Sequence, residues 1–165
     1  MPRFDHERGQ RHVKLEYSGT ERIPVGKDVV WAFITDPANI ASCMPDVLES
    51  TVVDPRTFDA VVQVAVGPVR GKFKFHVVLD PQPGGDRLNM KISGGGFGSV
   101  VDLTAGADIK SDAPNSTTLD WTGQASMRGP VATVGGRVID AQAKRVISTT
   151  FANVKAKLSP AAATI

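Results

Sequence analysis

Apolar and polar residues alternate along most of the chain between positions 50 and 127. The clearest stretch is "KFKFHVVLD" at 72–80, where every second residue up to Leu79 is apolar. A period of two is typical of a strand with one buried and one solvated face. Five further stretches share this pattern: 12–23, 57–66, 87–92, 100–110 and 118–127. Because turns rich in Gly, Pro, Asn and Asp separate most of them, they predict an antiparallel meander.

Two short helices are predicted after the first strand. The stretch 26–36 changes from a period of two to helical spacing. Asp36 and Pro37 then begin a second helix, because Asp is a good N-cap and Pro suits the first helical turn. Pro45 ends that helix, since it cannot continue the backbone hydrogen bonds. The inward positions of the two helices are Val30, Phe33, Ile34, Ile40, Cys43 and Met44.

The last predicted element is a long helix within 134–158, of about 22 residues and ~33 Å. Its inward positions are Ile139, Ala143, Val146, Ile147, Thr150, Val154 and Leu158. The apolar faces of all these strands and helices can be buried together in one α+β fold. In this predicted fold, a curved antiparallel sheet of about seven strands surrounds the long C-terminal helix. The two short helices plug one end. We expect one domain at 12–159, with loose tails at 1–11 and 160–165.

Composition and charge narrow the function classes. The 165 residues are 22% charged and 41% hydrophobic, which is globular rather than disordered. A net charge of +2, with Lys and Arg spread along the chain, argues against nucleic acid as a partner. The single cysteine cannot form an internal disulfide, which fits a reducing cytoplasm. The polar N-terminus does not resemble a signal peptide, and no apolar run approaches the roughly 20 residues of a membrane span, so we expect a cytoplasmic protein.

The predicted inner face of the sheet offers no acid–base chemistry. Its residues are almost all apolar, whereas the carboxylates, the lysines and His76 fall on the outer face. Catalysis by proton transfer or by a nucleophile needs titratable groups that converge on one pocket. No Cys, His and carboxylate positions have the spacing of metal ligands either. We therefore expect no catalytic residue, no metal and no cofactor.

Small residues on the same face predict either a filled space or a cavity. They are Ala60, Ala105, Ala107, Gly123 and Ala125. Because interiors pack densely, either the long helix fills the space above them or a dry cavity remains, and a dry cavity suits a lipophilic guest. The predicted lining is Tyr17, Phe33, Cys43, Met44, Val62, Val64, Phe75, Val77, Met90, Leu103, Ala105, Trp121, Ala125, Val146 and Thr150.

The glycine-rich stretch "SGGGFGSV" at 93–100 has two interpretations. It resembles a phosphate-binding loop, but such a loop leads from a strand into a helix, and here another alternating stretch follows. We interpret it as a hairpin tip. Gly95, Gly96 and Phe97 would then lie at the mouth of the cavity.

Cys43 and Tyr17 also have competing interpretations. Cys43 as a nucleophile needs a nearby base, and the sequence identifies none, so a buried structural thiol is favoured. Tyr17 either donates a hydrogen bond to a carbonyl of the guest or extends its hydroxyl to solvent at the rim of the sheet. The residues alone do not choose between these two roles.

Three stretches resemble a known family. "VWAFITDPANIASCMPD" at 30–46 resembles the "VW…L-T-D-P…A-x-C-x-P-G" signature of the CoxG-type family, small subunits associated with aerobic carbon monoxide dehydrogenases. "VQVAVGPVRGKFKFHVVL" at 62–79 is similar to that family's "V…V-G-P-V-x-G-x-F…V-x-L" hairpin. The stretch 117–154 resembles its closing strand, its "G-x-x-A-x-x-G-x-R-x-I" passage and its last helix. The resemblance extends over nearly the whole chain, from about 13 to 158.

The resemblance implies a START/Bet v 1-like helix-grip fold of the SRPBCC superfamily, whose members hold lipids, sterols, polyketides or other hydrophobic molecules between sheet and helix. It also implies a role in the maturation or membrane recruitment of molybdenum hydroxylases of the carbon monoxide dehydrogenase type, with a quinone as one candidate cargo. The implied partners are a hydrophobic small molecule, a molybdenum hydroxylase complex and peripheral contact with the inner face of the membrane. A homodimer is one candidate oligomeric state.

Two departures from the family pattern stand out. The family's Gly after Cys-x-Pro is Asp46 here, which puts a charge near one end of the fold. Longer relatives carry a C-terminal extension thought to aid membrane contact, whereas this sequence stops soon after its last predicted helix.

Three functions remain as hypotheses. The first is a non-catalytic carrier of a lipid or quinone, acting as an accessory to a redox enzyme. The second is an enzyme of the same fold, such as an aromatase/cyclase or a hydrolase. It needs polar groups in the cavity, which Tyr17, the 93–99 tip or the end helices would provide, and it gains support if His76 or Arg128 lies inside the pocket. The third is an assembly factor whose outer face binds a partner enzyme and whose cavity is incidental.

The alternation predicts that a charge on the inner face prevents folding. Each inward Phe or Val contributes about 1.5–3 kcal/mol on burial, so Phe75→Lys should abolish the cooperative thermal transition. Lys74→Gln, one position away on the outer face, is the matched control and should leave the melting temperature nearly unchanged. An unchanged melting temperature for Phe75→Lys would contradict the assignment of faces.

Overall fold

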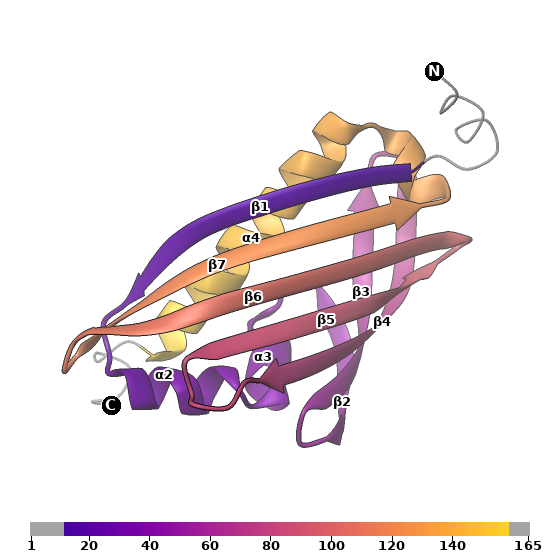
Figure 1. Ribbon diagram of the computed structural model, residues 1–165. Helices are drawn as coiled ribbons and strands as arrows, with labels where there is room; N and C mark the ends of the chain where they lie inside the picture. Colours follow the sequence, from indigo (N-terminus) through magenta and orange to yellow (C-terminus); the bar gives the residue numbers. More distant parts are fainter. Residues whose placement is uncertain (1–11, 159–165) are drawn as a thin grey trace.

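The computed structural model describes residues 12–158, so the two predicted tails lie outside the described residues. The elements in chain order are β1 (His12–Ile23), α2 (Lys27–Ile34), α3 (Pro37–Cys43), β2 (Val47–Asp54), β3 (Thr57–Val66), β4 (Val69–Pro81), β5 (Arg87–Gly96), β6 (Ser99–Ala113), β7 (Ser116–Arg128), the 3-10 helix η1 (Pro130–Val134) and α4 (Gly136–Leu158). The strands form one antiparallel sheet in the order β1-β7-β6-β5-β4-β3-β2. Figure 1 shows the sheet curving around α4, with α2 and α3 at one end.

This arrangement confirms the predicted fold class. The inner positions of the alternating stretches are buried or half-buried, as for Phe73 and Val77 on β4, while Lys74 and His76 between them are exposed. One strand carries no such signal. All but the first residue of β2 are exposed, because β2 is the edge strand next to β3 and has little packed against either face. Its alternation is therefore absent from the sequence.

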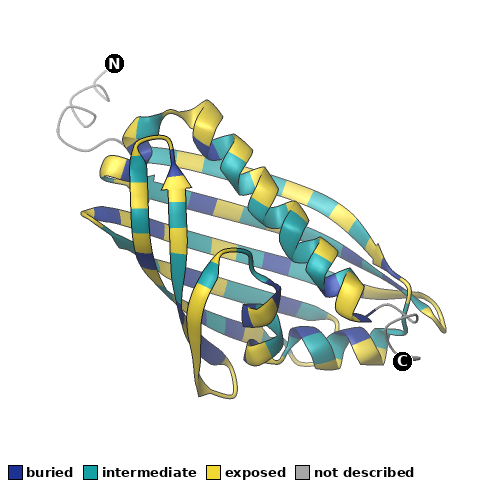
Figure 2. Ribbon diagram, turned by 180° about the vertical axis from the view of Figure 1, so that it is seen from behind, coloured by how far each residue is buried: buried dark blue, intermediate teal, exposed yellow. Residues whose placement is uncertain are grey.

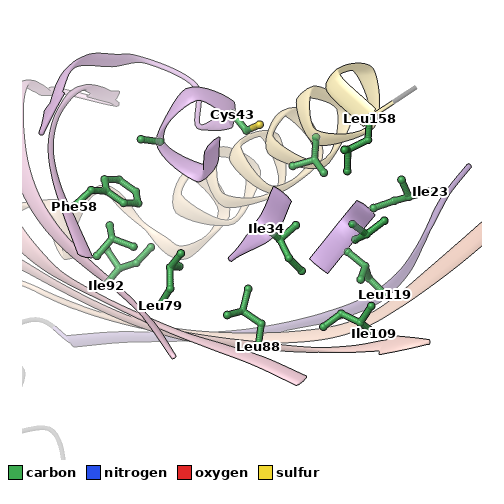
Figure 3. Packing of buried hydrophobic residues seen from close by; sticks show 14 of the residues in the cluster. Ile23, Ile34, Cys43, Phe58, Leu79, Leu88, Ile92, Ile109, Leu119 and Leu158 are labelled. Carbon is green, nitrogen blue, oxygen red and sulfur yellow. The ribbon is translucent and has the colours of Figure 1, made fainter. Parts of the chain in front are cut away.

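The short helices form as their end signals predict. The carboxylate of Asp36 accepts a hydrogen bond from the backbone N–H of Ala38 at 2.9 Å, and Pro37 is the first residue of α3. The helix ends at Cys43. Together α2 and α3 close one end of the sheet with a cluster of buried apolar side chains (Figure 3). The fully or nearly fully buried members include Ile23, Val30, Ile34, Cys43, Phe58, Val77, Leu79, Leu88, Ile109, Leu119, Val154 and Leu158.

Polar contacts tie α4 to the β1 edge of the sheet. The Tyr17 hydroxyl donates a hydrogen bond to Asp140 Oδ1 at 2.6 Å. One helical turn further along α4, Lys144 also pairs with Asp140. Near the other end of the helix, Lys155 Nζ lies 2.6 Å from Glu21 Oε1. The contacts of Tyr17 and Glu21 join residues more than a hundred positions apart and set where α4 lies along β1.

A second set of contacts ties α4 to the opposite side, at the corner between α3 and β2. Asn153 Nδ2 donates to the backbone carbonyl of Cys43 at 2.8 Å. Arg145 pairs with Asp46, the residue that replaces the family's Gly. Asp46 has a φ of 64°, a left-handed conformation that Gly adopts freely and Asp tolerates better than most residues. The departure from the family pattern is thus accommodated locally, and its carboxylate adds a contact to α4.

The Tyr17–Asp140 contact makes stability depend on alkaline pH. Burial first, and then the hydrogen bond to Asp140 and its negative charge, raise the pKa of Tyr17 from 10.0 to about 12. A raised folded-state pKa stabilises the fold below the unfolded value, and this contribution is lost as pH rises through the folded value. Tyr17→Phe should therefore lower the free energy of unfolding slightly at neutral pH, and its difference from wild type should shrink between pH 10 and about 12. Denaturant titrations at each pH measure this difference.

Asn153→Ala is the control for that experiment. It removes a contact of α4 whose two groups, a side-chain amide and a backbone carbonyl, do not titrate, so its difference from wild type should not shrink over the same alkaline range. A Tyr17→Phe difference that stays constant with pH would show that the hydroxyl does not hold α4 through Asp140.

Candidate functional site

The inner face of the sheet carries two separate clusters of buried apolar residues. The first is the cluster under α2 and α3. The second is smaller and consists of Phe73, Val101 and Val131 near the opposite end. Phe75 and Leu103 are only partly buried and pack against both clusters. The apolar face between the clusters is therefore not closed over.

We call the residues of intermediate exposure on the inner face between the clusters, most of them apolar, the inner band. Figure 2 looks onto this side of the sheet, with α4 crossing in front, and shows intermediate exposure along α4 and the middle of the strands. The inner band comprises Tyr17, Val62, Val64, Phe75, Met90, Leu103, Ala105, Trp121, Gly123, Met127, Val146, Thr150 and Phe151. Apolar side chains that keep part of their exposure inside a fold are where an apolar ligand gains most from burial.

Small residues leave open space at the centre of the inner band. The register places Tyr17 beside Gly123, Gly123 beside Ala105, and Ala105 beside Met90, in one row across four strands. A Cβ placed on Gly123 would have one neighbour within 4 Å, the carbonyl oxygen of Thr104 at 3.9 Å. A methyl group at Gly123 would therefore meet no side chain of α4.

Aromatic rings border this space on the β1 side. Trp121 lies 5.4 Å from Phe151 of α4, measured between ring centroids. The indole also lies against Gly19 of β1, where a Cβ would come within 2.9 Å of the ring. The Trp121 Nε1 atom is buried and has no hydrogen-bond partner among the described residues. An unpaired buried N–H is costly, and this donor lies on the same face as the row around Gly123.

Most of the predicted lining residues share one face. Tyr17, Val62, Val64, Phe75, Met90, Leu103, Ala105, Trp121, Val146 and Thr150 are half-buried members of the inner band, and Ala125 and Val77 are buried beside it. Phe33, Cys43 and Met44 instead belong to the plugged end, in or against the first cluster. Whether any of these residues contacts a guest stays a prediction.

The Tyr17 hydroxyl donates to Asp140 on α4, a partner that neither of its two predicted roles included. Its role toward a guest stays a prediction. The sequence could not identify this partner, which lies 123 positions away on another element.

The titratable groups do not converge on the inner band. Burial raises the pKa of the Cys43 thiol, which disfavours the thiolate that a nucleophile needs. His76 Nδ1 lies 2.6 Å from Asp59 Oδ1, both exposed on the outer face, and Arg128 is exposed as well. Within residues 12–158, no group of three or more His, Cys, Asp and Glu side chains is arranged to hold a metal ion.

The glycine-rich stretch forms the tip between β5 and β6. β5 ends at Gly96 and β6 begins at Ser99, so the stretch joins two strands rather than a strand and a helix. Phe97 is 65% exposed there and has a φ of 52°. Its ring lies over Gly71 of β4, where any side chain would collide with it. Gly95 and Gly96 likewise have backbone atoms of neighbouring strands where a Cβ would be.

The outer face carries two open hollows that sequence reasoning missed. The larger, of about 850 Å³, is bordered by outward residues of β4 to β7 and by the turn between β2 and β3. Arg87, one of its lining residues, donates from Nη1 to Asp108 Oδ1 at 2.9 Å, and Gly106 leaves room for the Arg87 side chain to lie flat on the sheet. A second hollow of about 410 Å³ lies beside His76. In the sequence, Gly106 on the outer face of β6 was the one residue that could have indicated the larger hollow. The hollows otherwise depend on the curvature of the sheet.

Comparison with known proteins identifies the relatives. The sequence model of the CoxG family of carbon monoxide dehydrogenase subunits matches residues 19–159. No curated protein matches the sequence. A conserved protein from Geobacillus kaustophilus is similar in structure, with a TM-score of 0.79 and 21% identity, over 88% of this chain and 95% of that chain.

Two further solved structures define the fold. A START superfamily protein from Mycobacterium smegmatis has a TM-score of 0.67 and 11% identity, over 87% of this chain and 96% of that one. The Zhui aromatase/cyclase from Streptomyces sp. R1128 has a TM-score of 0.61 and 14% identity, over 90% and 93%. At these identities the likeness shows the fold alone, and it confirms the START/Bet v 1-like helix grip. No helix among residues 12–158 is long and apolar enough to cross a membrane.

Two glycines on the inner face test whether the space above the sheet is open. Gly123→Ala should leave stability unchanged or raise it by about 0.4–1 kcal/mol, because it restricts the unfolded chain and meets no neighbour. Gly94→Ala should lower stability by more than about 1 kcal/mol, since its Cβ would collide with the Lys74 carbonyl and lie 2.8 Å from Phe75 Cα. Chemical denaturation compares the two. Equal destabilisation by both would contradict the open space.

Proposed function

Because the chain belongs to the CoxG family of carbon monoxide dehydrogenase subunits, we propose that it is a non-catalytic carrier of a hydrophobic small molecule. The cargo is a lipid or a quinone. The carrier serves as an accessory to a molybdenum hydroxylase of the carbon monoxide dehydrogenase type, in its maturation or its recruitment. It works in the cytoplasm, at the inner face of the membrane when it delivers or collects its cargo.

The observation that carries this proposal is the inner band. Apolar side chains between sheet and α4 keep part of their exposure, and the row around Gly123 is too small to fill the space above it. Each Å² of apolar surface that a guest covers there contributes about 25 cal/mol. The buried Trp121 N–H offers one hydrogen bond to an acceptor on the guest, such as a carbonyl, once the surrounding rings admit it.

The distribution of charge supports a carrier rather than an enzyme. His76 or Arg128 inside the pocket would have supported the enzyme hypothesis, and both lie outside the inner band. The one polar group of the band with a perturbed proton affinity is Tyr17, and its raised pKa makes it a poor proton donor and a poor base. The likeness to an aromatase/cyclase rests on the fold alone.

Filling the inner band should remove ligand binding. Gly123→Leu places a side chain in the open space, so the affinity for a ubiquinone or menaquinone analogue, or for a fluorescent fatty acid, should fall at least about tenfold. Thr122→Leu is the matched control, because it adds similar bulk one position away, on the outer face beside the larger hollow. Fluorescence titration of the purified protein measures both. Native mass spectrometry should also detect the cargo in wild-type protein.

The outcomes separate the hypotheses. Loss of binding with Gly123→Leu alone supports the inner band. Loss with Thr122→Leu alone moves the ligand site to the outer hollow and contradicts the proposal. If no lipophile binds at all, but a molybdenum hydroxylase copurifies from the native host, the assembly-factor hypothesis replaces the carrier.

A further inference from the structure

One end of the molecule exposes an aromatic side chain on a thin tip. Phe97 is the most exposed large apolar residue among those described, and glycines precede and follow it. Its ring centroid lies 6.3 Å from that of Phe73, which in turn lies 6.2 Å from that of Phe75. Phe97 therefore packs beside the second cluster, in which Phe73 is buried, and leaves most of its own ring exposed. Phe97 is also one of two non-glycine residues between 12 and 158 with a positive φ, so the backbone holds the ring outward at some cost.

Three segments meet at this end of the molecule. They are the β3–β4 turn with the start of β4, the β5–β6 tip, and the segment from the end of β7 through η1 to the start of α4 (Figure 1). Short contacts join them: the Ser99 hydroxyl accepts a hydrogen bond from the Val131 N–H at 2.9 Å, and Gly67 lies against Val134. The antiparallel order requires this, because alternate hairpins point to the same end.

These segments are basic and contain no acid. Residues 66–74, 93–101 and 126–139 include no Asp or Glu. They carry Arg70, Lys72, Lys74, Arg128 and Arg137. Among the described residues, none of these five cations pairs with a carboxylate, and Arg70, Lys72, Arg128 and Arg137 are all exposed. Residues 1–11 contain three arginines and two acidic residues, so they add no net negative charge to the chain.

Acids gather at the opposite end. Asp28 and Asp36 lie in α2 and at the start of α3. Asp54, Asp86 and Asp112 lie at or beside the turns β2–β3, β4–β5 and β6–β7, which the topology brings to that same end. Cations lie there as well, since Lys27 pairs with Asp86 and Arg22 with Asp112. The two ends therefore differ because the cations of the first end have no carboxylate partner among the described residues.

We propose that the basic end docks on an anionic lipid bilayer. The docking surface, which we call the tip surface, consists of Phe97, Val100, Arg70, Lys72, Arg128 and Arg137. A bilayer fits these features because its headgroup layer provides diffuse negative charge for dispersed cations, and the acyl region below accepts a protruding aromatic ring. The inference deepens the proposed function and in part rests on it, because a carrier of a lipophile has to contact the bilayer that holds its cargo.

Vesicle flotation tests the tip surface in the full chain. Wild-type protein should bind vesicles of equimolar phosphatidylcholine and phosphatidylglycerol and not vesicles of phosphatidylcholine alone, and the binding should weaken as salt rises. Phe97→Ser should weaken it at least about tenfold. Arg128→Gln and Arg137→Gln should each weaken it about fivefold. All three residues are exposed, so the melting temperatures should match wild type.

Two control variants lie away from the tip surface. Leu48→Ser removes an apolar residue of β2 that is 52% exposed, and Lys91→Gln removes an exposed cation of the outer face. Both should bind anionic vesicles as wild type does. No preference of the wild type for anionic vesicles would overturn the proposal and point to an acidic protein as the partner. Equal effects of Phe97→Ser and Leu48→Ser would overturn it too.

A titration in solution separates this proposal from the carrier function. Phe97→Ser should keep the affinity for a soluble fluorescent fatty acid while it loses vesicle binding. Vesicle binding by a wild-type protein that binds no lipophile would leave the tip surface standing and end the carrier proposal. Lipophile binding by a wild-type protein that does not bind vesicles would leave the carrier proposal standing and end the proposal of the tip surface.

Discussion

A single α-helix cannot cover the inner face of a seven-stranded sheet. Strands spaced about 4.8 Å apart make this face roughly 29 Å wide, whereas a helix with its side chains is about 10 Å across. The short helices α2 and α3 cover one end, and η1 helps to cover a small patch at the other. What remains is the inner band, and its partial exposure follows from this mismatch of widths. The site is therefore a consequence of the architecture rather than of any one residue.

The contacts at the two edges keep α4 in place above that uncovered face. Tyr17 and Glu21 hold it along β1, and Asp46 and the Cys43 carbonyl hold it at the α3–β2 corner. Most of these groups are half-exposed, so each contact is weak and screened by solvent. These contacts hold the helix along β1 and at the α3–β2 corner, and none of them packs it against Gly123. Such an arrangement preserves space beneath the helix at little cost in stability.

The protein separates its chemistry by face and by end. Apolar surface lies inside, and the ionisable groups lie on the outer face or at the edges. Along the long axis, cations without a carboxylate partner gather around Phe97, whereas Lys27 and Arg22 pair with acids at the other end. The proposed carriage of a hydrophobic cargo and the proposed contact with an anionic surface would use adjoining parts of one molecule.

The sequence alone determined which side chains face inward, because a strand has a period of two and a one-residue error would bury Lys74 instead of Phe75. It also located α3, since the Asp36 cap and Pro37 act through the nearest backbone groups. It did not reveal β2, whose edge position removes the alternation, nor the Asp140 partner of Tyr17 and the Arg145 partner of Asp46, which are about a hundred or more positions away. Only the tertiary structure decided that the space above Gly123 stays open and that the basic residues share one end. Both depend on how far the sheet curves and where α4 crosses it, and these are set by long-range packing that no local pattern encodes.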